Sequence, residues 1–177
     1  PGHSSAASDV YKRQVLDTAV EAAGWGSPPE GRFQGVALHE SFGSICAEVA
    51  EISMEDGKPR VHRVFAAVDC GKAFNPGLIR DQIMSGVIFG LSAAMGGKLT
   101  VAGGRIEQSN FHDYTLLRMS AAPEVEVHIL ESPEAKVGGI GEVGTPPIAP
   151  AVCNAIRAAT GRAVRSLPII EALAKSG

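Results

Sequence analysis

The stretch Lys136-Val-Gly-Gly-Ile-Gly-Glu-Val-Gly-Thr-Pro-Pro147 decides how the rest of the chain is interpreted. It places glycines on both sides of one carboxylate, Glu142, and two prolines end it. A helix-like run follows from Ile148 to Thr160, and Gly161 stops it. Glycine lets a backbone approach a ligand closely, and proline is tolerated in the first turn of a helix. The pattern predicts a tight loop that enters a helix N-terminus and carries Glu142 at its centre.

Three interpretations of this loop are open on the residues alone. Gly139 to Gly144 satisfies G-x-G-x-x-G, a dinucleotide fingerprint that requires a strand directly before it and an acidic residue about 20 positions later. Here the expected strand, 125–130, ends too early, and positions 163–165 carry no acid. The second interpretation is a structural glycine-rich turn with a solvated glutamate. The third is a catalytic loop that presents Glu142 to a bound ligand.

A resemblance favours the catalytic loop. The segment Gly141-Glu142-Val-Gly-Thr-Pro-Pro-Ile-Ala-Pro-Ala-Val-Cys-Asn-Ala-Ile156 resembles the C-terminal signature of the molybdenum-cofactor-binding subunit of the xanthine dehydrogenase/aldehyde oxidase family. It is most similar to the isoquinoline 1-oxidoreductase β-subunit branch. The resemblance runs from about Val15 to the end of the chain. It implies that Glu142 is the active-site base.

The resemblance also implies cofactor contacts. Asp81-Gln82-Ile-Met-Ser-Gly86 resembles the family segment whose glutamine hydrogen-bonds the pterin, and an amide offers both donor and acceptor. From the residues alone, Gln82 would be a solvated helical side chain. Glycine N–H groups can bind phosphates, so Gly139 and Gly141 are candidate cofactor contacts. The pterin's dithiolene sulfurs would hold molybdenum, in molybdopterin or its cytosine dinucleotide form, so no side chain is assigned to the metal.

The implied activity is a molybdenum-dependent oxidoreductase, or hydroxylase, that oxidises aldehydes or N-heterocycles with water-derived oxygen. A carboxylate within hydrogen-bond reach can act as its general base. We therefore expect the fold to shelter Glu142 beside Gln82. Iron–sulfur clusters would lie on a partner subunit, and further pterin and substrate contacts on a missing N-terminal part of the same subunit, so the fragment would be inactive alone. The alternative is a non-catalytic structural or assembly domain, with Glu142 facing bulk water away from the Gln82 helix.

Composition bounds these interpretations. A chain of 177 residues with 45% hydrophobic content is one globular domain or part of a larger one. The net charge of −3 gives no basic field for nucleic acid, and the glycine-broken apolar runs look too short for a membrane span. Cys46, Cys70 and Cys153 show no C-x-x-C and no disulfide framework. Residues 1–14 resemble translated sequencing adapter from environmental DNA, so the domain fragment is taken as residues 15–177.

The hydrophobic patterns predict an α+β fold with mixed or antiparallel strands and two main helices, the C-terminal part of a molybdopterin-binding domain. Strands are expected at 33–39, 45–54, 61–69 and 124–130, with hairpins at 45–69 and 98–108 and a first helix at 15–23.

The longest helix has its own signals. Asn75 is the expected N-cap and Pro76 the first helical residue, and the helix runs to about Met95. An apolar stripe at 3.6-residue spacing passes through Gly86 and Gly90, which leave a groove where another element can approach closely. His39, His62 and the His112–Asp113 pair are predicted to have structural or surface roles, because no nucleophile or ligand set lies near them in the sequence.

Overall fold

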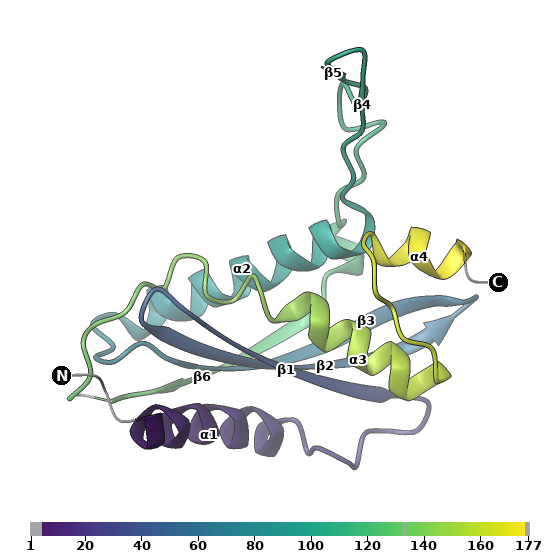
Figure 1. Ribbon diagram of the computed structural model, residues 1–177. Helices are drawn as coiled ribbons and strands as arrows, with labels where there is room; N and C mark the ends of the chain where they lie inside the picture. The colour runs from purple at the N-terminus through teal and green to yellow at the C-terminus, as the bar shows by residue number, and fades with distance from the viewer. Residues whose placement is uncertain (1–4, 133, 176–177) are drawn as a thin grey trace.

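The computed structural model describes residues 5–132 and 134–175, which fold into three layers around a central sheet (Figure 1). The sheet has the order β1-β2-β3-β6. Its strands are β1 (Phe33–Ser41), β2 (Ser44–Glu55), β3 (Lys58–Asp69) and β6 (Glu124–Leu130). The first three are antiparallel neighbours, and β6 lies parallel to β3 at the edge. The sheet is therefore mixed, as predicted.

Helices cover both faces of this sheet. The longer ones are α1 (Ser5–Ala22), α2 (Pro76–Gly96) and α3 (Ile148–Thr160), and α4 (Ile169–Lys175) follows near the C-terminus. Side chains of β2 alternate between two clusters, because successive strand residues point to opposite faces. Ala47 and Val49 pack with Val15 of α1, whereas Cys46 and Ala50 face the cluster that contains α2 and α3.

Helix α2 follows its sequence signals. The Asn75 side chain accepts a hydrogen bond from the Leu78 N–H (3.0 Å), and Pro76 is the first helical residue. The buried positions are those of the predicted stripe: Ile79, Ile83, Gly86, Val87, Gly90, Leu91 and Ala94. The N-cap, the start and the buried face of the helix are therefore confirmed.

One expectation about α2 is wrong. The sequence predicts apolar runs that are too short and too interrupted by glycine to span a membrane. Gly86 and Gly90 do not interrupt the helix, and its length and mean hydropathy of 1.2 are sufficient for a membrane span. Buried helices of globular cores pass the same test. Here the stripe is buried in the cluster between α2, α3 and the sheet, while Met84 and Phe89 on the same helix are exposed.

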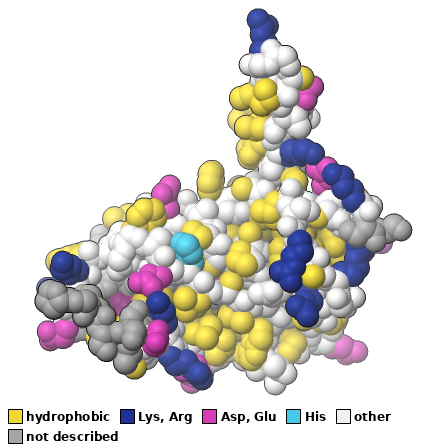
Figure 2. Space-filling model, viewed as in Figure 1, with side chains coloured by type: hydrophobic (Ala, Val, Ile, Leu, Met, Phe, Trp, Pro, Cys, Tyr) yellow, Lys and Arg dark blue, Asp and Glu magenta, His cyan; other side chains and the backbone are white. Residues whose placement is uncertain are grey.

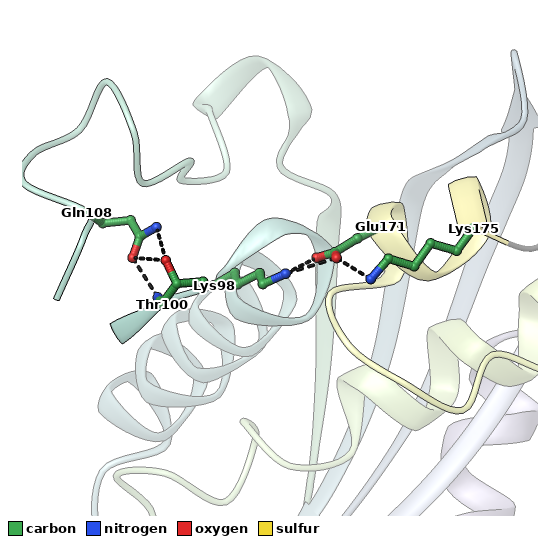
Figure 3. Close-up of polar contacts among 5 residues, drawn as sticks. All are labelled: Lys98, Thr100, Gln108, Glu171 and Lys175. Carbon is green, nitrogen blue, oxygen red and sulfur yellow. Dashed lines mark hydrogen bonds and ion pairs between the residues drawn. The ribbon is translucent and has the colours of Figure 1, made fainter. Parts of the chain in front are cut away.

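The segment after α2 forms an arm that projects from the body (Figure 1). Its hairpin, β4 (Val101–Ala102) with β5 (Arg105–Ile106), is confirmed but shorter than predicted. At its base, Lys98 pairs with Glu171 of α4 (2.7 Å), and Thr100 N–H donates to Gln108 Oε1 (2.7 Å) (Figure 3). Hydrophobic side chains lie along one side of the arm (Figure 2).

The chain ends differ from the predicted elements. Helix α1 begins at Ser5 instead of Val15, because residues 5–14 contain no helix breaker and several good helix formers. Lys12 also pairs with Glu40 of β1 (2.8 Å). Helix α4 is missing from the predicted elements, since seven residues are too few for a clear helical period. The adapter origin of residues 1–14 stays a prediction.

Candidate functional site

The glycine loop is hydrogen-bonded to the turn between β1 and β2. The Gly139 N–H donates to the Phe42 carbonyl oxygen (2.8 Å), and the Ser44 hydroxyl donates to the Gly139 carbonyl oxygen (2.8 Å). The Gly138 N–H donates to the Cys70 carbonyl oxygen (3.0 Å) at the end of β3. Two strand ends therefore hold the segment that leads to Glu142.

The next part of the loop lies directly on α2. A Cβ added at Gly90 would meet the Thr145 carbonyl oxygen at 2.6 Å, and one added at Gly86 would meet the Gly144 carbonyl carbon at 3.2 Å. A turn closes here, because the Thr145 N–H donates to the Glu142 carbonyl oxygen (2.9 Å). The groove predicted at the two helical glycines is confirmed, and the loop after Glu142 fills it.

The structure places the turn that follows Glu142 on the helix that carries Gln82 but does not shelter the Glu142 carboxylate. Gln82 lies one turn before Gly86 and is half-buried, and its amide has no hydrogen-bond partner in the described part of the chain. Glu142 is exposed. The expectation that this fold would bury Glu142 is therefore wrong, because no described segment covers the outer side of the loop. The non-catalytic alternative predicts that Glu142 faces bulk water, away from the Gln82 helix. The structure agrees on the exposure of Glu142. It does not agree on the position, because the loop that carries Glu142 packs on α2.

The two candidate glycines differ. The Gly139 N–H donates to the Phe42 carbonyl oxygen in this structure, and its role as a cofactor contact stays a prediction. Its glycine identity has a steric cause, since a Cβ there would lie 2.9 Å from Phe42 Cβ. Gly141 has open space around it, and its N–H has no partner within residues 5–132 and 134–175. Gly141 therefore keeps a free donor beside Glu142.

The other predicted residues have structural surroundings. Asp113 accepts hydrogen bonds from the Asn110 and Ser109 N–H groups, which lower its pKa to about 2. His112 lies 3.6 Å from this carboxylate. His62 contacts the Ser53 hydroxyl (2.9 Å). The contact of His62 fits the structural role predicted for it, whereas His112 is an exposed residue near Asp113 without a hydrogen bond to it.

Sequence reasoning missed Glu48. It lies in β2 between Ala37 and Ala66 and is completely buried on the face covered by α2 and α3. Its Oε1 accepts a weak hydrogen bond from the Cys46 thiol (3.8 Å), and its Oε2 has no hydrogen-bond partner. Burial raises the pKa of the Glu48 carboxyl well above its usual range, because no charged partner offsets the loss of water. The available signal was a glutamate at an inward position of an alternating strand.

Two groups near the loop have donors without a partner in the described part of the chain. Among the described residues, no three His, Cys, Asp or Glu side chains are grouped where they could hold a metal ion. The free amide of Gln82 and the free N–H of Gly141 are donors suited to a heterocycle edge or an anionic group. These residues fit an organic cofactor that brings its own metal ligands.

The nucleotide-binding interpretation fails its structural requirement. Strand β6 ends at Leu130, and no strand in the described part of the chain runs directly into Gly139. The glycine loop instead follows an irregular segment that crosses the ends of β2 and β3. A dinucleotide fold needs a direct strand–loop–helix connection here.

Comparison with known proteins identifies the family. Residues 5–123 match the family model of the molybdopterin cofactor-binding domain. The chain belongs to this family. The matched range contains Gln82 and ends before Glu142. The family recognised in the sequence and the α+β fold are both confirmed.

Relatives of this molybdopterin-binding domain are subunits of oxidoreductases. It is 35% identical over 167 residues to isoquinoline 1-oxidoreductase subunit beta of Brevundimonas diminuta, covering 91% of the chain and 21% of that protein. It is 31% identical over 146 residues to the aldehyde oxidoreductase molybdenum-binding subunit PaoC of Escherichia coli (strain K12), covering 78% and 18%. The chain thus spans about a fifth of the length of these relatives.

A solved structure shares the fold. Quinoline 2-oxidoreductase from Pseudomonas putida 86 superposes with a TM-score of 0.64 at 24% identity, covering 75% of the chain and 18% of that protein. At this identity the likeness concerns the arrangement of the helices and the mixed sheet.

Proposed function

We propose that this molybdopterin-binding domain forms one wall of the active site of a molybdenum hydroxylase. The enzyme would oxidise aldehydes or N-heterocycles with oxygen derived from water, the two compound classes in the relatives' names. One observation carries the proposal. The turn after Glu142 is fixed on α2 one helical turn from Gln82, and both side chains lack a hydrogen-bonding partner within the described residues.

In this proposal the cofactor and three residues of the chain have different chemical roles. The bound cofactor, molybdopterin or its cytosine dinucleotide form, would supply the redox chemistry at molybdenum. The Gln82 amide would donate to and accept from the pterin edge, and the Gly141 N–H would add a second donor. A Glu142 carboxylate oxygen would accept the proton of the attacking water, which is the task of a general base.

The exposure of Glu142 defines what the rest of the enzyme must do. The chain spans about a fifth of its relatives' length, and in this proposal the remaining part of the same subunit covers the loop. Exclusion of water there would hold the carboxylate against the reacting water instead of bulk solvent. Electrons would leave through iron–sulfur clusters on a partner subunit. Residues 15–177 alone would lack most of the cofactor cage and would have no activity.

The first test is Glu142→Gln in the full-length subunit. The amide keeps the size of the side chain but cannot accept the proton, so turnover should fall about 10²- to 10⁴-fold while molybdenum and pterin content stay unchanged. Glu107→Gln on the exposed hairpin is the control and should leave turnover unchanged. Near-normal turnover of Glu142→Gln would favour the non-catalytic domain, which the exposure of Glu142 keeps as the second candidate.

The second test is Gln82→Ala in the same subunit. Loss of one amide that bonds the pterin should lower the molybdenum and pterin content per subunit about threefold to tenfold, since a net hydrogen bond is worth about 1 kcal/mol. Ser85→Ala, on the exposed side of the same helix, is the control. Unchanged metal loading of Gln82→Ala, measured by elemental analysis, would remove the pterin contact from the proposal.

A further inference from the structure

Two hairpin turns in this sheet share one geometry but carry different residues. Phe42–Gly43 joins β1 to β2 with φ angles of 55° and 75°, and Asp56–Gly57 joins β2 to β3 with φ angles of 50° and 75°. Positive φ at both central positions is the pattern of a type I′ turn, which favours Asn, Asp or Gly at the first position. Asp56 follows this preference. Phe42 does not, and a bulky side chain at positive φ is strained.

The fold gains little from this phenylalanine. Its side chain is 64% exposed, so it buries little apolar surface to offset the strain. Asn or Asp would fit the backbone better and would be more soluble at this position. A residue that local conformation and burial both disfavour indicates a role outside folding.

Phe42 lies next to the loop that carries Glu142. Its carbonyl oxygen accepts the Gly139 N–H, and Gly139 lacks a Cβ where one would collide with Phe42 Cβ at 2.9 Å. Ser44, on the other side of the turn, holds the Gly139 carbonyl oxygen. Glu142 follows Gly139 by three residues, a length of chain that spans at most about 11 Å. The exposed Phe42 ring therefore belongs to the turn whose backbone holds the loop that carries the exposed Glu142 carboxylate.

We infer that the Phe42 ring stacks on a planar aromatic ring of the substrate and so selects aryl aldehydes or N-heteroaromatic compounds over aliphatic aldehydes. This inference rests on the proposed function, because it uses Glu142 to define where the substrate binds. Stacked aromatic pairs add about 0.5–1.5 kcal/mol beyond area burial, which corresponds to roughly threefold to tenfold in affinity.

The test compares Phe42→Asn with Phe42→Tyr in the full-length holoenzyme. Asn suits the turn but removes the ring, whereas Tyr keeps the ring. Phe42→Asn should raise the KM for benzaldehyde and the Kd for isoquinoline about threefold to tenfold, with little change in kcat. The KM for propanal should stay within about twofold. Phe42→Tyr should retain the wild-type constants, and Trp25→Leu, an exposed aromatic beyond the other end of β1, should change none of them.

Three results would overturn the inference. One is an equal loss for benzaldehyde and propanal, or a wild-type enzyme with no affinity for either aromatic compound. Another is a lower pterin content in Phe42→Asn, which would mean that the ring packs on the cofactor. The third is a lower thermal midpoint in Phe42→Asn, which would mean that the ring stabilises the fold. The isoquinoline Kd does not require turnover, so it remains informative even if Glu142→Gln shows that Glu142 is not the base.

Discussion

At the scale of single residues, Glu48 is the least expected feature of the core. It is an acid in the middle strand of a sheet, surrounded by alanines and one thiol, with one oxygen that has no hydrogen-bond partner. A buried carboxylate without a countercharge is very unfavourable, so burial raises the pKa of this group well above its usual range. Unfolding above the usual pKa of a glutamate is therefore expected to release a proton from Glu48.

Glu48 should make stability depend on pH in a predictable direction. Above pH 4.5, the usual value for this group, the unfolded chain loses the proton while the folded chain keeps it. Stability therefore falls as pH rises from there toward the raised folded pKa, by up to about 1.4 kcal/mol per pH unit. Glu48→Gln should remove this dependence on pH. The free energy of unfolding of the variant, relative to that of the wild type, should therefore increase between pH 5 and pH 8.

Urea unfolding of the chain at several pH values checks this expectation. Glu107 is exposed, so the free energy of unfolding of Glu107→Gln should change with pH in the same way as that of the wild type. If the Glu48→Gln and wild-type curves are also parallel, Glu48 is ionised or hydrated in the folded state, and its burial has no effect on the pH dependence.

The structural roles of single residues could be predicted from the sequence only where neighbouring residues determine them. Asn75 caps α2 because an Asn-Pro pair has that preference by itself. The two hydrogen bonds of Gly139 could not be predicted, because its N–H donates to the distant Phe42 carbonyl oxygen and its carbonyl oxygen accepts from Ser44, 95 positions away. The exposure of Glu142 depends in the same way on which distant segments cover the loop.

At the scale of elements, the contact between α2 and the loop after Glu142 positions the candidate site. Glycine costs a helix about 1 kcal/mol relative to alanine, and α2 accepts this cost at both positions where the loop approaches. The contact is tightest at Gly90, where the Thr145 carbonyl oxygen and the Ile148 side chain leave no room for a methyl group. The close approach keeps the start of α3 against α2.

Gly90→Ala should therefore destabilise the domain. The gain in helix propensity is smaller than the cost of overpacking, so the free energy of unfolding should fall by about 1–3 kcal/mol. Gly96→Ala is the matched control, since a Cβ there would make only ordinary contacts at 3.9 Å and should be neutral or slightly stabilising. Denaturant unfolding measures both. A Gly90→Ala variant as stable as Gly96→Ala would show that the loop is not tightly held.

Element types were more predictable than their partners. Period-two and period-3.6 patterns located β1, β2, β3, α2 and α3. The parallel pairing of β6 with β3 is a non-local choice that follows from the α2 crossover and the arm between them. The short α4 has no period long enough to detect, although its Glu171 fastens the arm.

At the scale of the whole molecule, the candidate site lies on the surface of the domain and no described segment covers it. The loop with Glu142 and the half-buried Gln82 lie at its surface. The arm exposes Leu99, Ile106 and Phe111, and Met119 at its end is almost fully exposed. A site that excludes water needs a second wall, and the length of the relatives leaves room for one. The proposed chemistry therefore belongs to the assembled subunit.

The most direct measurement is the rate at which substrate reduces the bound cofactor in a single turnover of the full-length enzyme. In Glu142→Gln, substrate should bind with an unchanged Kd while the reduction rate falls at least about a hundredfold, because only the proton acceptor has been removed. Reduction at the wild-type rate, with the cofactor fully loaded, would contradict the assignment of Glu142 as the base.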